Sequence, residues 1–172
     1  MTAVGSASAR LLILALLGCR VGAPGGGAAS LDPTHAASMV DSVRAFADSV
    51  ARGITTRGPV AWRDYLADDP AFFMASEGRL VFPNHEAASQ TIEALRHQIT
   101  EIQLRWGDSL RVDPLAPGLA VLAASYHETR VDTTGKRLEE DGFFTGLVEH
   151  RAGRWQLRDA HWSVVTPPPA VP

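Results

Sequence analysis

The sequence predicts an α+β fold, a curved antiparallel sheet packed against three N-terminal helices. Apolar residues recur at helical spacing as far as Ile99, and apolar and polar residues alternate after it. Helices followed by a run of strands are typical of a segregated α+β domain rather than of alternating βαβ units. The chain of 172 residues has room for one such core. We therefore expect a single folded domain over residues 32–165.

Three predicted helices open this domain. The first begins at Asp32-Pro33, an N-cap acceptor followed by a proline suited to the first helical position, and Gly53 is expected to end it. A shorter second helix begins at Gly58-Pro59 and ends at Pro70. Asn84 caps the third, whose apolar stripe is Ala88, Ile92, Leu95 and Ile99.

The strands follow from turn signals. Residues 72–75 and 80–82 flank Ser76-Glu77-Gly78 and predict a hairpin. Three long strands are predicted over residues 119–131, 137–151 and 154–165, separated by turns at Thr134-Gly135 and Ala152-Gly153. Short turns between long strands favour an antiparallel meander. The proline-rich residues 166–172 are predicted to be a disordered tail.

The first 18 residues predict an export signal. Arg10 precedes the apolar run 11–17, which is too short for a membrane span but has the length of a signal-peptide core. The run ends in Leu16-Leu17-Gly18-Cys19, which resembles the bacterial lipobox, so we expect a lipid anchor on Cys19 and a cell-envelope location. Cleavage after Val21-Gly22-Ala23, giving a soluble secreted or periplasmic protein, is the alternative. Residues 19–31 then form a flexible tether.

Composition excludes several classes of function. The net charge is −3 and basic residues form no cluster, which argues against a nucleic-acid partner. Cys19 is the only cysteine, and the six histidines show no paired ligand spacing, so we expect no metal site and no thiol chemistry. Neither a phosphate-binding glycine loop nor a Gly-x-Ser-x-Gly elbow is present. We expect no cofactor.

Three stretches carry a family resemblance: 43–53, which ends the first helix at a glycine, Tyr65-Leu66-Ala67-Asp68-Asp69, and the closing strand 153–163. In this order they resemble the nuclear transport factor 2-like superfamily, which includes ketosteroid isomerases and SnoaL-like cyclases. The resemblance implies a cone-shaped fold, an apolar pocket and a homodimer. The isomerases' tyrosine falls on Phe46 and their catalytic base on Met74 or Ala75, so isomerase chemistry is not expected.

Strand parity supplies other site candidates. Asp159 and His161 share a face with the apolar Trp155 and Leu157, so we expect them to point into the pocket, where both could act on one bound molecule without forming a direct dyad. Further pocket candidates are Tyr126, Glu128, Trp106 and Phe144.

Two functions from different classes follow. The first is an exported domain, attached to the membrane only by its lipid, that binds a small apolar ligand or a partner without the isomerase residues. The alternative is a SnoaL-like lyase or cyclase that uses Asp159 and His161. A purely structural envelope protein is a third reading.

Overall fold

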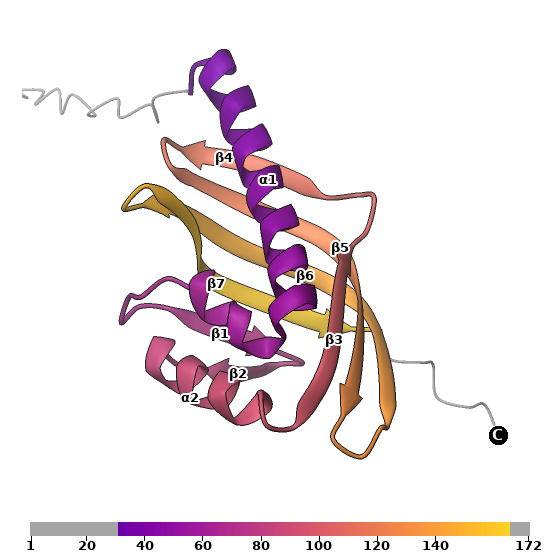
Figure 1. Ribbon diagram of the computed structural model, residues 1–172. Helices are drawn as coiled ribbons and strands as arrows, with labels where there is room; N and C mark the ends of the chain where they lie inside the picture. Colours follow the sequence, from indigo (N-terminus) through magenta and orange to yellow (C-terminus); the bar gives the residue numbers. More distant parts are fainter. Residues whose placement is uncertain (1–30, 166–172) are drawn as a thin grey trace, which may run out of the picture.

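The computed structural model describes residues 31–165 (Figure 1). Two α-helices, one 3-10 helix and seven strands make up this part of the chain. In chain order they are α1 (Pro33–Arg57), η1 (Pro59–Asp64), β1 (Phe73–Ser76), β2 (Arg79–Phe82), α2 (His85–Leu95), β3 (Ile99–Trp106), β4 (Arg111–Ala116), β5 (Leu119–Asp132), β6 (Arg137–Arg151) and β7 (Arg154–Val164). The predicted signal peptide, lipid-anchor cysteine and proline-rich tail lie outside the described residues, as does all of the tether except Leu31.

The seven strands form one curved sheet in the order β2-β1-β7-β6-β5-β3, and β4 also pairs with β5. Strands β5, β6 and β7 form the predicted antiparallel meander, which is confirmed. The sheet is mixed rather than fully antiparallel, because β1 runs parallel to β7. A parallel pair joins segments far apart in sequence, so no local turn signal could have revealed it.

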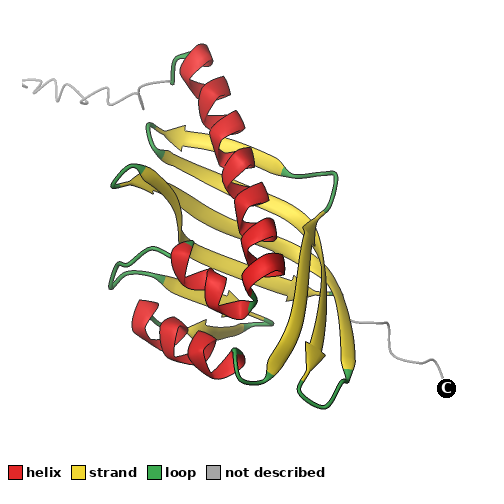
Figure 2. Ribbon diagram, viewed as in Figure 1, coloured by secondary structure: helices red, strands yellow, loops and turns green. Residues whose placement is uncertain are grey.

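The helices cover one face of this sheet (Figure 2). Helix α1 lies diagonally across it and buries Met39, Val43, Phe46, Ala47, Val50, Gly53 and Ile54. Asp32 caps the helix as predicted, since its Oδ1 accepts hydrogen bonds from the backbone nitrogens of Thr34 (3.0 Å) and His35 (3.1 Å). The α+β fold predicted from the sequence is therefore confirmed. Among residues 31–165, no helix combines the length and apolar character that a membrane span requires.

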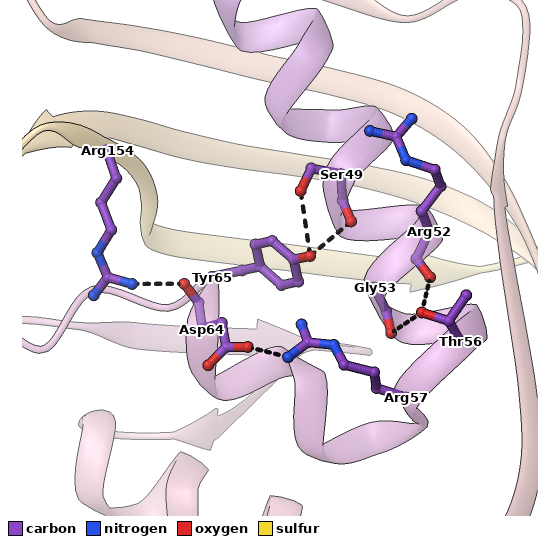
Figure 3. A network of polar contacts seen from close by, with 8 residues as sticks. All are labelled: Ser49, Arg52, Gly53, Thr56, Arg57, Asp64, Tyr65 and Arg154. Atoms are coloured by element: carbon purple, nitrogen blue, oxygen red, sulfur yellow. Dashed lines mark hydrogen bonds and ion pairs between the residues drawn. The ribbon is translucent and has the colours of Figure 1, made fainter.

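Gly53 does not end α1, which continues for one more turn to Arg57 and stops at Gly58, where φ is +75°. Gly53 instead gives room to Tyr65, whose hydroxyl would lie 2.1 Å from a Cβ at this position. The Tyr65 hydroxyl donates a hydrogen bond to the carbonyl of Ser49 at 2.7 Å (Figure 3). Nearby, Arg57 forms an ion pair with Asp64. This ion pair and the tyrosine hydrogen bond connect the end of α1 to η1 and the residue that follows it.

Three further details differ from the predictions. The second predicted helix is a short 3-10 helix, η1, which ends at Asp64 and not at Pro70. Ile99 begins β3 instead of ending the third helix, although its side chain still packs against the core. Strand β4 was not predicted, because Pro114 within it removes a ladder donor and weakens the strand signal.

Replacing Gly53 by alanine should destabilise the domain by about 1–3 kcal/mol, because the new methyl group collides with Tyr65. Helix propensity alone would give the opposite sign, a gain of about 1 kcal/mol. Urea unfolding measures the change in the free energy of unfolding. Ala45→Gly, at an exposed position of α1, is the control that measures the effect of helix propensity alone. In a Tyr65→Phe background the loss should shrink. A Gly53→Ala protein that is more stable than wild type would contradict this packing.

Candidate functional site

A cavity of about 190 Å³ lies between η1, α2 and the strands of the sheet. Its walls come from β1, β2, β3, β5, β6 and β7, from η1 with the following Leu66, and from α2. Most of its surface is apolar, and the lining residues are Pro59, Trp62, Leu66, Met74, Ser76, Phe82, Ile92, Leu95, Ile99, Ile102, Tyr126, Glu128, Arg130, Glu140, Leu157, Ala160 and Trp162.

Trp162 of β7 organises the aromatic side of this pocket. Its ring contacts Trp62 edge-on at 5.6 Å between centroids and Tyr126 at 4.7 Å. Behind it, Phe144 at 4.6 Å and Trp106 at 5.9 Å complete the cluster. Such edge, tilted and stacked contacts stabilise aromatic groups beyond the gain from burial.

The charged groups of the pocket come from two neighbouring strands, β5 and β6. The Tyr126 hydroxyl donates to Glu140 Oε1 at 2.8 Å, and Arg130 Nη2 donates to Glu140 Oε2 at 2.8 Å. Glu128 lies opposite Glu140 in the β5–β6 ladder. Like charges directly opposite each other destabilise a sheet, and here Arg130 lies between them and offsets the repulsion.

Glu128 is the least satisfied member of this cluster. Its Oε1 lies 3.0 Å from Arg130 Nε, within ion-pair range, yet Arg130 Nε makes no hydrogen bond because the N–H is not directed at the carboxylate. The Glu128 side chain is only 12% exposed. The pKa of Glu128 is raised to about 7, mainly by burial, because the opposing effect of Arg130 and the smaller raising effect of Glu140 do not cancel the effect of burial. Glu128 therefore changes its protonation state near neutral pH.

Tyr126 is held as a neutral hydrogen-bond donor. Burial is the main cause that raises the pKa of its hydroxyl, and the bond to Glu140 raises it further. Its ring fits because Gly142, its partner on β6, has no side chain: a Cβ there would lie 2.6 Å from the ring. A glycine in the middle of a long strand thus serves the close approach of the tyrosine and of the Ser163 carbonyl oxygen, which would lie 2.1 Å from the same Cβ.

The structure brings together two of the four predicted pocket residues. Tyr126 and Glu128 line the cavity, whereas Trp106 and Phe144 do not reach it. Phe144 is fully buried, and Trp106 donates its indole N–H to the carbonyl of Ala47 at 2.8 Å. Arg130 and Glu140 were missed. Counting outward from the predicted Thr134-Gly135 turn pairs Glu128 with Asp141, one residue away from Glu140, its partner in the structure.

The predicted inward orientation of Asp159 and His161 is wrong. The β6–β7 register shifts between Leu147 and Val148, so that Leu147 pairs with Asp159 and Val148 with Leu157, and Arg158 is the extra residue of a bulge. Beyond the bulge, Ala160 and Trp162 line the pocket instead. His161 is exposed, and Asp159 Oδ1 accepts from Leu147 N at 3.3 Å. An acid–base pair of these two residues inside the pocket is therefore dropped.

The positions that correspond to the isomerase groups carry no such chemistry. Phe46 packs edge-on against Tyr65 at 6.0 Å, and Met74 presents a thioether to the pocket. Over residues 31–165, no three His, Cys, Asp or Glu side chains are grouped in a way that could hold a metal ion. Glu128 is the one carboxyl group in the described residues that combines pocket lining with a strongly raised pKa.

Comparison with solved structures places the chain in a well-populated fold. A nuclear transport factor 2-like protein from Salmonella enterica superposes with a TM-score of 0.59 at 11% identity, covering 80% of this chain and 95% of its own. A ketosteroid isomerase-like protein from Erwinia carotovora atroseptica gives 0.58 at 13% identity (74% and 97% covered). A type 2 hexachlorocyclohexane dehydrochlorinase gives 0.62 at 11% identity (81% and 100% covered).

These likenesses show the fold, and the fold alone. The protein has the nuclear transport factor 2-like α+β architecture that also fits a SnoaL-like domain. No protein-family model matches the chain, and no significantly similar protein was found among curated sequences. The function must therefore be argued from the pocket.

The raised pKa of Glu128 predicts a pH-dependent stability. Between the ordinary value of 4.5 and about 7, the folded state binds more protons than the unfolded state, so the contribution of Glu128 falls as pH rises through this range. Over this range the ionisation of Glu128 lowers the free energy of unfolding by an amount on the order of 3 kcal/mol. Glu128→Gln cannot ionise and so lacks this loss of stability. The free energy of unfolding of the variant minus that of the wild type should therefore increase from about pH 5 to about pH 8.

Urea unfolding at both pH values measures this difference. Glu139→Gln, an exposed neighbour on β6, is the matched control and should show no such change. A constant difference between Glu128→Gln and wild type would mean that Glu128 ionises normally in the folded protein.

Proposed function

We propose that this domain binds a small, mostly apolar ligand in the pocket between β5–β7, η1 and α2. The observation that carries the proposal is an apolar cavity whose charged groups all come from β5 and β6, an arrangement that orients a ligand. An engineered apolar cavity of 150 Å³ holds a benzene molecule, so about 190 Å³ suits a single ring with a short substituent.

We also propose that the domain works outside the cytoplasm. The apolar run 11–17 and Leu16-Leu17-Gly18-Cys19 support an export signal with lipid attached to Cys19, and a soluble secreted or periplasmic form is the alternative. The predicted homodimer stays a prediction.

Acid–base catalysis is a second candidate function, favoured by one observation. A carboxyl group with a pKa of about 7 in an apolar pocket is suited to take up and release protons at neutral pH. A lyase-type enzyme would then use Glu128, not Asp159 and His161.

Filling the pocket should abolish binding of small apolar probes. Leu95 of α2 lines the cavity and is half-buried, so Leu95→Trp inserts a ring with little disturbance of the core. Toluene and benzyl alcohol should raise the melting temperature of the wild type, because they bind only the folded state. Their affinity should fall about tenfold or more in Leu95→Trp. Ala94→Trp, an exposed neighbour, is the control and should bind like wild type.

Lipid attachment is tested on the mature N-terminus. Mass spectrometry of the protein expressed in a diderm bacterium should show an acylated Cys19, and Cys19→Ser should leave the protein uncleaved or cleaved elsewhere without lipid. A mature N-terminus at Pro24 would instead support the secreted form.

A further inference from the structure

The charges of the pocket are unbalanced. Among its lining residues the only charged or titratable groups are Tyr126, Glu128, Arg130 and Glu140, which β5 and β6 supply. Every lining residue from η1, α2, β1, β2, β3 and β7 is uncharged. Two carboxylates thus share one guanidinium, and the pocket has an excess negative charge whenever Glu128 is ionised.

The hydrogen bonds show which group lacks a partner. Glu140 accepts from both Tyr126 and Arg130, one bond to each oxygen. Glu128 accepts no hydrogen bond from any described residue, since the Arg130 Nε at 3.0 Å forms an ion pair with it but no hydrogen bond. A buried carboxyl group without a donor costs stability, so a ligand that supplies one gains affinity.

We propose that the ligand of this pocket is an apolar molecule bearing a protonated amine, whose N–H groups donate to Glu128. This inference rests on the proposed binding function and specifies the chemistry of its ligand. The ammonium group balances the excess carboxylate, and the apolar part lies against Trp162, Trp62 and Ile92. The cavity volume limits the molecule to about one ring with a short aminoalkyl arm.

Other ligand classes fit these groups less well. A carboxylic acid brings a third negative charge to a site whose only guanidinium already bonds Glu140. A neutral alcohol can occupy the apolar volume but leaves the charge unbalanced. Because the amine binds ionised Glu128, its affinity should rise between about pH 5.5 and about pH 8, where Glu128 loses its proton. Tyr126 stays neutral over this range because the pKa of its hydroxyl is raised.

The test compares three probes that share one benzyl group: benzylamine, benzyl alcohol and phenylacetate. Calorimetry at about pH 8 should give an affinity for benzylamine about tenfold or more above that of the other two in the wild type. Glu128→Gln should remove this preference and keep the binding of benzyl alcohol, whereas Glu139→Gln should retain both. In the wild type, benzylamine affinity should increase several-fold from about pH 5.5 to about pH 8, with no such increase for benzyl alcohol.

Each contrary result has a distinct meaning. If benzyl alcohol and toluene bind in a Leu95-dependent way but benzylamine is not preferred, the inference fails and the binding function stands. A preference for benzylamine that survives in Glu128→Gln, or an affinity that is flat with pH, also overturns it. If none of the probes binds, the proposed function fails and the inference with it. Should Glu128→Gln not fold, the pH series on the wild type decides.

Discussion

The bulge at Arg158 in β7 is the constraint on which the pocket depends. One extra residue reverses the parity of the strand, so Leu157, Ala160 and Trp162 all face the cavity although they do not alternate evenly. Trp162 then meets Trp62, Tyr126 and Phe144. At the same point Leu157 bonds to the segment before β1: its N–H donates to Tyr65 O, and its carbonyl accepts from Ala67 N. The bulge thus lies where the meander joins the short strands.

The β5–β6 ladder sets the chemistry of the site. Its register places Glu128 opposite Glu140 and Tyr126 opposite Gly142. Arg130, two residues along β5, reaches Glu140 with a hydrogen bond but meets Glu128 only as an imperfectly directed ion pair. A buried charge without a partner lowers the stability of the fold, so a buried charged cluster is stable only when each of its groups is paired. A cluster left one donor short of completion is therefore where a ligand is expected to bind.

The neighbours in known structures share this architecture at 11–13% identity, and none transfers a function. The cavity lies between the sheet, η1 and α2. The fold supplies the cavity, while the side chains on β5, β6 and β7 decide what it can hold. In this chain those side chains form an acidic end and an aromatic wall.

The sequence by itself determined the α+β class, the first and last helices, the hairpin and the three long strands, because periodicity and turn residues are local. It also identified Tyr126 and Glu128 as pocket residues, since strand parity holds along an unbroken strand. Only the tertiary structure decided the parallel β1–β7 pair, the bulge that turns Asp159 and His161 outward, and the role of Gly53 beside Tyr65. Each of these depends on contacts between segments distant in sequence, which no local pattern records.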